Sequence, residues 1–353
     1  MKALITAGGH GTRLRPITHT QNKHLIPIAN KLMLDYALEY VRDANIIDVG
    51  IIINADDNSI KSEFGDGSSR HVRITYIPQD APLGLAHVVK ISEKFIGNDP
   101  FIFYLGDNIL VGGVSKFISE FENASSNCHL ALSRVPDPNR FGVAEIKNNK
   151  IIGIEEKPNI PKSNFAVTGI YLYDSTIFEA VNNIKPSARG ELEISDAHQY
   201  LLNKGYHISY SEITGWWKDT GKPSDLLEAN RLVLDNIKDR RESILTNCEI
   251  SGNIHLGKNV KISNSKLEGP IIINDDSIID KAHIAHHTAI GKRCEIINSK
   301  VGYSIIMSDS TIRNVEYKIT NSLLGTDVRI IGNHIYHSAH RFILGDQSRV
   351  EIA

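Results

Sequence analysis

The sequence predicts an α/β domain followed by a parallel β-helix, because its hydrophobic pattern changes once along the chain. Up to about residue 235, short apolar runs typical of buried strands alternate with stretches that have helical spacing. Beyond about residue 240, apolar residues recur every six positions. A length of 353 residues also favours two domains. We therefore expect one domain at residues 1–240 and a second at 241–353.

The first half contains apolar runs that we interpret as strands, at residues 3–6, 49–53, 72–77, 101–105 and 130–135. Residues 32–41 carry apolar side chains at helical spacing and predict a helix. Strands separated by amphipathic stretches of helix length indicate βαβ units and a largely parallel sheet. In such sheets, ligands bind at the carboxyl ends of the strands.

The second half carries its apolar residues in two series with a period of six. The first is Ile250, Leu256 and Ile262, and the second is Ile272, Ile278, Ile284, Ile290 and Ile296. A parallel β-helix explains this period, because each hexapeptide forms one side of a triangular coil and turns its apolar residue inward. Breaks near residue 267 and after residue 301 predict loops or imperfect coils. Residues 226–237 have a helical pattern and are expected to link the two halves.

Composition excludes several classes of protein. A net charge of −2 removes the usual electrostatic reason to expect nucleic acid or an anionic membrane as a partner. The three cysteines, Cys128, Cys248 and Cys294, are far apart and show neither metal-ligand spacing nor a disulfide framework. The first apolar run is too short for a signal peptide or a membrane span. We therefore expect a cytoplasmic protein.

A glycine-rich turn follows the first expected strand, with Gly8, Gly9 and Gly11 leading into Thr12 and Arg13. Glycines let the backbone approach a polyphosphate closely and point amide groups at it. A threonine hydroxyl and an arginine guanidinium are suitable donors to phosphate oxygens. The run is neither a Walker A loop nor a dinucleotide-binding fingerprint. Taken alone, it equally fits a plain strand-to-helix turn.

Further candidates lie after other expected strands. The amide of Gln79 suits the edge of a nucleotide base, and Gly84 would permit close approach of a base ring. Asp107 follows the strand at 101–105, at the end where ligands bind. Mg²⁺ is typically held by one or two carboxylates together with substrate phosphates.

The run from Gly8 to Thr18, together with Lys23 and Pro27, resembles the signature of the sugar-1-phosphate nucleotidyltransferases. The resemblance is to the long form of the glucose-1-phosphate thymidylyltransferases, and it covers essentially the whole chain. It implies a Rossmann-like nucleotidyltransferase domain followed by a left-handed β-helix of hexapeptide repeats. It also implies Mg²⁺-assisted transfer of a nucleotidyl group from dTTP to glucose 1-phosphate, which yields dTDP-glucose and pyrophosphate.

The resemblance implies a role for each motif residue. The nucleotide would be bound by Gly8, Gly9, Gly11, Thr12, Arg13, Gln79, Gly84 and Asp107. The sugar phosphate would be bound by Asn108, Gly142, Glu156, Lys157 and Val167. Arg13 and Lys23 would steady the pyrophosphate leaving group, Lys157 would bind the attacking phosphate, and Asp107 and Asp219 would bind Mg²⁺. Residues 189–194 also match, either as a substrate contact or as a structural salt bridge.

Other functions stay open at this point. One is a related enzyme that uses UTP or another sugar phosphate, because an apolar pocket discriminates a methyl group by only ~1–3 kcal/mol. A second is a bifunctional enzyme whose β-helix adds acyl transfer. A third is a non-catalytic regulatory subunit, although the presence of Arg13, Lys23, Asp107, Lys157 and Asp219 argues against it.

The role of the second half is also a matter of expectation. We expect the β-helix to serve stability or assembly into a homo-oligomer. Its histidines are expected at the surface or at coil corners, where His283, His286 and His287 form one group and His334, His337 and His340 another.

Overall fold

The structure is a computed structural model that describes residues 1–241, 244–332 and 346–352. It consists of two compact units that do not follow the chain continuously. The first comprises Met1–His10 and Leu34–Asp219, and the second comprises Gly11–Met33 and Thr220–Ala353. The segment that carries most of the glycine-rich signature therefore belongs to the same unit as the β-helix.

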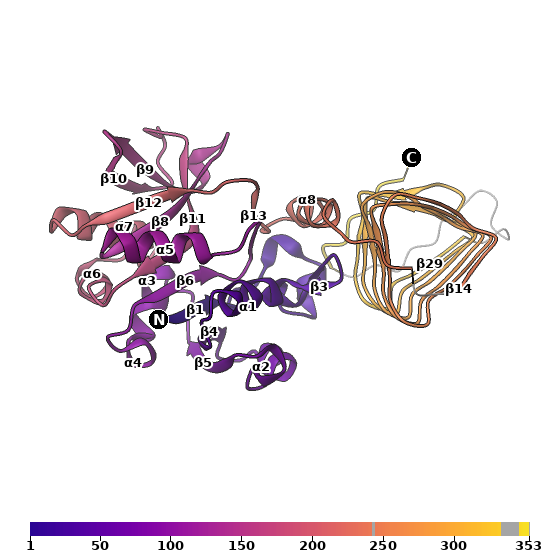
Figure 1. Cartoon of the computed structure of the whole chain (residues 1–353), viewed down its shortest axis with the longest axis horizontal. Coiled ribbons are helices and arrows are strands. Elements are labelled where there is room, and N and C mark those ends of the chain that lie inside the picture. Colours follow the sequence, from indigo (N-terminus) through magenta and orange to yellow (C-terminus); the bar gives the residue numbers. More distant parts are fainter. Residues whose placement is uncertain (242–243, 333–345, 353) are drawn as a thin grey trace. The chain divides into compact units, whose positions relative to one another are not determined.

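The first unit is built around a mixed sheet (Figure 1). Its parallel part has the order β5–β4–β1–β6, made of Arg73–Gln79, Asp48–Asn54, Lys2–Thr6 and Phe101–Leu105. The strands expected in these regions are confirmed to within two residues at each end. Apolar residues such as Leu4, Phe101 and Phe103 are fully buried in this sheet, as expected for strands covered on both faces.

The sheet is not largely parallel throughout, which corrects the sequence-based expectation. The remaining strands are β11 (Phe165–Tyr173), β8 (Cys128–Arg134), β9 (Gly142–Lys147), β10 (Lys150–Glu156) and β12 (Ile208–Glu212). Strand β11 runs antiparallel to β6, β8 and β9. Strands β9 and β10 form a hairpin across Asn148 and Asn149, both with positive φ. Such a two-residue turn needs no crossover helix, so the βαβ rhythm ends here.

Helices accompany this sheet in the first unit. They are α1 (Met33–Asp43), α2 (Ser59–Phe64), α3 (Leu85–Ile91), α4 (Glu93–Ile96), α5 (Ser115–Ala124), α6 (Ile177–Asn183) and α7 (Ile194–Asn203). Helix α1 confirms the helix expected at residues 32–41. A separate two-stranded sheet pairs β7 (Asn108–Leu110) with β13 (Trp217–Asp219).

The second unit contains a β-helix, visible in Figure 1 as stacked triangular coils. Its strands form three parallel sheets, as in a left-handed parallel β-helix. The first sheet holds β14 (Ile244–Thr246), β17 (Lys261–Ser263), β20 (Ile278–Asp280), β23 (Glu295–Ile297), β26 (Thr311–Arg313) and β29 (Arg329–Ile331). The second holds β15 (Glu249–Ser251), β18 (Lys266–Glu268), β21 (His283–Ile284), β24 (Lys300–Gly302) and β27 (Ile319–Thr320). The third holds β16 (Ile254–Leu256), β19 (Ile271–Ile273), β22 (Thr288–Ile290), β25 (Ile305–Ile306) and β28 (Leu323–Leu324).

Most coils of the β-helix have 17 residues, so a strict period of six fails once per coil. Equivalent core positions are Leu245, Ile262, Ile279 and Ile296, which follow at intervals of 17. The expectation that Ile272 and Ile278 point inward is wrong, because the inward positions lie one residue later in the sequence. Ile273 and Ile279 are buried instead, while Ile278 is 41% exposed. The cause is the corner after Ile279, where the next inward residue, Ile284, follows after five positions.

Two further elements complete the second unit. Helix α8 (Pro223–Leu234) begins three residues before the helix expected at 226–237, because proline is favoured in the first turn. The segment Gly11–Met33 contains three short 3-10 helices, Thr12–Leu14, Ile17–His19 and Lys23–Leu25, and a small hairpin of β2 (Pro27–Ile28) and β3 (Lys31–Leu32). No helix in the described ranges is both long and apolar enough to cross a membrane.

Candidate active site

The glycine-rich turn begins at the carboxyl end of β1 and is tied to the end of β4. The Gly9 amide donates a hydrogen bond to Asn54 Oδ1 at 3.2 Å, and Gly9 has a φ of 124°. A Cβ at Gly8 would lie 3.1 Å from the same oxygen. Asn54 therefore fixes the start of the turn, and the adjacent backbone needs glycine there. Asn54 was not among the residues predicted from the sequence, although its place at the end of an expected strand was a usable signal.

The two candidate metal-binding carboxylates lie on neighbouring backbone positions of the first unit. Asp107 follows β6 and precedes Asn108, the first residue of β7. Strand β13 pairs with β7 in antiparallel register, so that Asp219 lies opposite Asn108. The fold thus brings together two aspartates that are more than a hundred residues apart in the sequence, as expected.

The side chain of Asn108 connects this pair to a tryptophan. Trp217 Nε1 donates to Asn108 Oδ1 at 2.6 Å, and Asn108 Nδ2 donates to Asp107 Oδ1 at 3.0 Å. An indole nitrogen is only a donor, so it fixes the orientation of the amide and turns the NH₂ group to the carboxylate. Asn108 is 2% exposed. The relay orients Asp107, whereas the expected contact of Asn108 with the sugar phosphate stays a prediction.

Two carboxylates suit a hard, oxygen-liganded cation such as Mg²⁺, provided that substrate phosphates or water supply the other ligands. Within the described part of the chain, no set of three or more histidine, cysteine or acidic residues could hold a metal ion by itself. Asp107 and Asp219 provide two carboxylates at neighbouring backbone positions.

A second polar cluster surrounds Glu156 at the end of β10. Ser195 Oγ donates to Glu156 Oε2 at 2.7 Å, and Gly142 lies opposite Glu156 in the β9–β10 pair. A Cβ at Gly142 would lie 2.5 Å from Ser195 Oγ. Gly142 thus makes room for the bond that holds Glu156. Ser195 is buried and was missed in the sequence analysis, since nothing in the pattern of α7 distinguishes it from a core serine.

Cationic side chains lie on the other oxygen of Glu156. Lys157 Nζ is 3.3 Å and Arg189 Nη2 is 3.6 Å from Glu156 Oε1. Arg189 Nη2 also donates to the buried Glu193 at 2.8 Å. The structural salt bridge considered for residues 189–194 is therefore present. Lys157 is 44% exposed at its side chain, which leaves its charge accessible to an anion.

The remaining candidates of the first unit have structural partners of their own. Gln79 ends β5, and its amide lies 3.2 Å from His87 Nδ1. Gly84 has a φ of 97°, and a Cβ there would lie 2.4 Å from the carbonyl oxygen of Leu192. The backbone of Leu192 is therefore one reason for the glycine. Val167 lies where the register between β11 and β8 shifts, and its side chain is buried. Contacts of these residues with base or sugar stay predictions.

The second unit carries the rest of the signature. Gly11 adopts a φ of 55°, and a Cβ there would lie 2.9 Å from Thr18 Cγ2 and 3.2 Å from Lys23 Cβ. Thr18 Oγ1 also donates to the Gly11 carbonyl oxygen at 2.8 Å. The glycine thus lets the turn fold onto the chain that leads to Lys23. Thr12 opens the first 3-10 helix, directly after Gly11.

Arg13 lies against Gly221, the second residue after Asp219 in the sequence. A Cβ at Gly221 would lie 2.7 Å from Arg13 Nη2, so the glycine leaves space for the guanidinium. This role of Gly221 was not predicted from the sequence, although the residue stands in the same short motif as Asp219.

The histidines of the β-helix have local partners. His283 Nε2 lies 2.7 Å from Glu268, His286 Nδ1 lies 2.6 Å from the Gly269 carbonyl oxygen, and His287 Nε2 lies 2.8 Å from Asp235. All three reach the surface. The group of His334, His337 and His340 lies outside the described residues.

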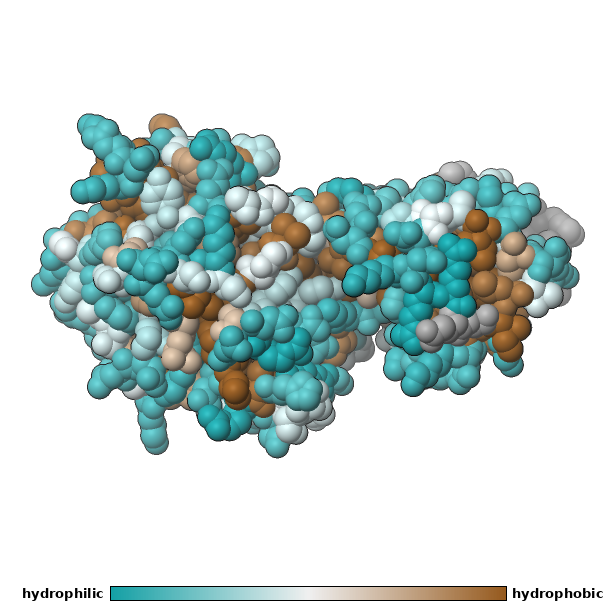
Figure 2. Space-filling view, viewed as in Figure 1, coloured by the Kyte–Doolittle hydropathy of each residue, from teal (hydrophilic) through white to brown (hydrophobic). Residues whose placement is uncertain are grey.

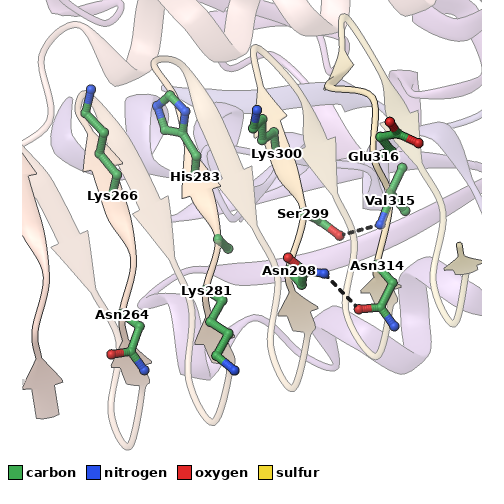
Figure 3. Close-up of a pocket in the computed structure, with 11 residues that line it drawn as sticks. Asn264, Lys266, Lys281, His283, Asn298, Ser299, Lys300, Asn314, Val315 and Glu316 are labelled. Carbon is green, nitrogen blue, oxygen red and sulfur yellow. Dashed lines mark hydrogen bonds between the residues drawn. The ribbon is translucent and has the colours of Figure 1, made fainter.

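A polar groove of about 410 Å³ runs along one corner of the β-helix (Figure 3). Lys266, His283 and Lys300 occupy the same position on successive coils. A second row holds Asn298, whose Nδ2 donates to Asn314 Oδ1 at 3.1 Å. Lys266 is paired with Glu268 at 2.7 Å. These bonds join neighbouring residues and coils, and we assign the rows to coil stacking.

Comparison with known proteins agrees with this arrangement. The family model described as nucleotidyl transferase matches residues 2–236. A glucose-1-phosphate thymidylyltransferase from Streptomyces griseus is 43% identical over the full length of both chains. A crystal structure from Bacillus anthracis, described as a glucose-1-phosphate thymidylyltransferase in complex with sucrose, is 43% identical with a TM-score of 0.63. It covers 68% of this chain and 98% of its own.

A UDP-glucose pyrophosphorylase complexed with UDP-glucose is 26% identical with a TM-score of 0.60. It covers 67% of this chain and 99% of its own. The fold, the paired aspartates and the family match together define an enzyme of the nucleotidyl-transferring class. The chain belongs to the nucleotidyl transferase family.

Proposed function

We propose that this chain transfers a thymidylyl group from dTTP to glucose 1-phosphate and releases pyrophosphate. The observation that carries the proposal is the β7–β13 pair, which brings Asp107 and Asp219 to neighbouring positions and orients Asp107 through Asn108. The full-length similarity to the Streptomyces griseus enzyme supports the choice of substrates. The same similarity supports activity over the alternative of a non-catalytic subunit.

In the proposed reaction, a phosphate oxygen of glucose 1-phosphate attacks the α-phosphorus of dTTP. The bond between the α-phosphorus and the oxygen that it shares with the β-phosphorus breaks, and pyrophosphate leaves. The attacking group is already an anion, so no protein nucleophile is required. The residues of the chain therefore contribute positioning and charge stabilisation.

Asp107 and Asp219 would hold Mg²⁺ together with substrate phosphate oxygens. The metal would supply charge neutralisation at those oxygens. The amide of Asn108 keeps the Asp107 carboxylate in one orientation, because its other end is fixed by Trp217. We expect this relay to matter for the rate more than for the fold.

The cluster around Glu156 would bind the sugar phosphate. Glu156, held by Ser195, would accept hydrogen bonds from sugar hydroxyls. Lys157 would bind the attacking phosphate and offset the repulsion between two anionic reactants. Arg13 and Lys23 would stabilise the negative charge that develops on pyrophosphate.

UTP is the main alternative to dTTP, because a solved relative of this fold is a UDP-glucose pyrophosphorylase. The two bases differ by one methyl group, which is worth ~1–3 kcal/mol in a pocket of suitable shape. Pyrophosphate release from the purified chain with Mg²⁺ and glucose 1-phosphate tests the proposal, with dTTP, UTP, ATP, CTP and GTP compared. Preference for dTTP is expected, and preference for another nucleotide would contradict the thymidylyl assignment.

We further propose a cytoplasmic location and a homo-oligomer in which the β-helix makes subunit contacts. Its first sheet exposes Ile244, Ile278 and Ile331, and Figure 2 shows hydrophobic side chains on the β-helix surface. Deletion of residues 241–353 is expected to reduce the oligomeric state in solution. An unchanged state would contradict the proposal.

A further inference from the structure

The hairpin that follows Lys23 ends in a strained two-residue turn. Pro27 pairs with Leu32 and Ile28 with Lys31, which leaves Ala29 and Asn30 as the turn. Their φ angles are 46° and 61°, as in the type I′ turns that favour asparagine and glycine. Alanine is rare at such an angle, because its Cβ crowds the backbone. The surrounding structure must therefore stabilise this turn.

Hydrogen bonds from α8 and the β-helix hold the turn. The Ala29 amide donates to Asn230 Oδ1 at 2.9 Å, and Asn30 Nδ2 donates to the Ile290 carbonyl oxygen at 2.7 Å. Asn230 Nδ2 in turn donates to the His287 carbonyl oxygen at 3.1 Å. Asn230 is 1% exposed on α8. Its single amide thus links the hairpin to the β22 coil.

The outer face of the third sheet of the β-helix is buried at β22, where Asn230 and the hairpin turn contact it. Ile290 points into the coil, so Ala289 beside it faces outward. Ala289 and Ile305 pair on β22 and β25, and both are only 1% exposed. On the first sheet, by contrast, Ile278 is open to solvent. Helix α8 packs beside β22, and Gln21 Nε2 reaches Met307 Sδ at 3.4 Å from the signature segment.

The hairpin is joined to the catalytic candidates by short backbone links. The Ile26 amide donates to the Lys23 carbonyl oxygen, and the Met33 amide donates to the Ile26 carbonyl oxygen, each at 3.1 Å. Lys23 in turn packs against Gly11, two residues before Arg13. A shift of the hairpin would therefore reach both Lys23 and Arg13.

We propose that Asn230 is a positioning residue through which the β-helix sets the place of the signature segment Gly11–Met33. Asn230 touches no reacting group and acts through the Ala29–Asn30 turn. This inference rests on the proposed function for the roles of Arg13 and Lys23, but the link itself does not. Under this proposal, the β-helix contributes to nucleotide binding as well as to stability.

The test compares Asn230→Ala with Asn236→Ala in the full chain. Asn236 follows the same helix and is exposed. Within the described residues, its side chain bonds only to the Leu232 carbonyl oxygen. The first readout is hydrogen–deuterium exchange of residues 11–33, which needs no activity. We expect faster exchange in this segment for Asn230→Ala and wild-type exchange for Asn236→Ala. Equal protection in both variants would overturn the proposal.

The second readout separates the two substrates. Asn230→Ala is expected to raise the KM for dTTP and lower kcat, together about tenfold to a hundredfold in kcat/KM, since small misplacements cost that much. The KM for glucose 1-phosphate is expected to change less, because Glu156 and Lys157 lie in the other unit. An equal rise of both KM values would contradict a specific positioning role.

A second variant keeps the proposal testable if Asn230→Ala does not fold. Asn30→Gly tolerates the positive φ and removes only the bond to Ile290, so the hairpin should still form. It is expected to speed exchange of residues 11–33 to a smaller extent, and unchanged exchange in a folded Asn30→Gly variant would count against the proposal. If the wild-type chain lacked nucleotidyl transfer altogether, the proposed function would fail while the exchange comparison still decided the positioning role.

Discussion

Asp219 lies directly opposite Asn108 in the antiparallel pair of β7 and β13, one residue from Asp107. If the two aspartates bind Mg²⁺ as proposed, substrate phosphates would complete its coordination. The pair therefore links a local strand register to the proposed chemistry.

Replacing either aspartate should remove turnover without unfolding the protein. Asp107→Asn or Asp219→Asn keeps the side-chain size but weakens metal binding. Loss of one such electrostatic group commonly costs ~3 kcal/mol, or roughly a hundredfold in kcat. Pyrophosphate release measures the rate and thermal unfolding measures the fold. Near wild-type turnover in both variants would refute the metal assignment.

The relay through Asn108 predicts a smaller effect at Trp217. Trp217→Phe removes the indole donor but keeps an aromatic ring beside Phe141, which now lies edge-on at 5.6 Å between centroids. Leaving the buried Asn108 oxygen without this partner should cost ~1–3 kcal/mol. We expect kcat to fall about tenfold while the KM for glucose 1-phosphate changes little. Trp216→Phe serves as the matched control, and equal losses in both would argue against the relay.

The space at Gly142 predicts a defect in sugar-phosphate binding. Gly142→Ala would press a methyl group on Ser195 Oγ and disturb Glu156. We expect a higher KM for glucose 1-phosphate, by about tenfold or more, with the KM for dTTP nearly unchanged. Gly153→Ala on β10 is the control, since its Cβ would find ordinary contacts at 3.5 Å. The same KM in both variants would contradict the role given to Glu156.

The turn at Ala29 predicts a stabilising substitution. Ala29→Gly relieves the strain of a positive φ, worth ~1–2 kcal/mol, but adds chain entropy to the unfolded state. A net gain of about 0.5–1 kcal/mol is expected in denaturant unfolding. Ala29→Val should instead destabilise the protein. The opposite order of these two variants would show that the turn is not strained.

Acid should destabilise the first unit through the buried His198. Burial lowers the pKa of His198 to about 3, and its Nε2 lies 2.6 Å from the Tyr173 hydroxyl. The unfolded chain takes up this proton near pH 6.5, whereas the folded chain resists it. Stability from His198 is therefore present above pH 6.5 and is lost as the pH falls toward the folded pKa, at up to about 1.4 kcal/mol per pH unit.

The variant His198→Gln keeps a polar atom near Tyr173 but does not titrate. Its free energy of unfolding should fall less steeply between pH 6.5 and about 4 than that of the wild type. Chemical denaturation across this range measures the slopes. Parallel curves would show that His198 does not contribute to acid sensitivity.

Much of this architecture could be predicted from the sequence, because hydrophobic periodicity reports which side chains are buried. The strands up to residue 105 followed from such patterns, whereas the proximity of Asp107 to Asp219 was expected from the family resemblance. The strand expected at residues 130–135 is present as β8, but its antiparallel pairing with β11 was missed, since a buried strand shows no alternation that reveals its direction. The coil length of 17 residues was also missed. One corner of each such coil is one residue shorter than a period of six requires, and the neighbouring isoleucines hide the resulting shift of the inward positions.

Supporting residues were the hardest to foresee. Asn54, Ser195 and Asn230 are small polar side chains in ordinary helical or strand sequence, and their partners lie far along the chain. Local propensity cannot show such contacts, because they depend on which backbone atoms the fold brings opposite. Gly142 and Gly221 are visible as glycines in the sequence. The sequence does not show that Ser195 and Arg13 occupy the space where a Cβ atom at these positions would lie.

The most direct test of the central claim is to identify the products formed from dTTP, glucose 1-phosphate and Mg²⁺ by mass spectrometry. The wild-type chain should form dTDP-glucose and pyrophosphate in equal amounts, and Asp219→Asn should form at least about a hundredfold less in the same time. Absence of dTDP-glucose from the wild-type reaction, or undiminished formation by Asp219→Asn, would contradict the account.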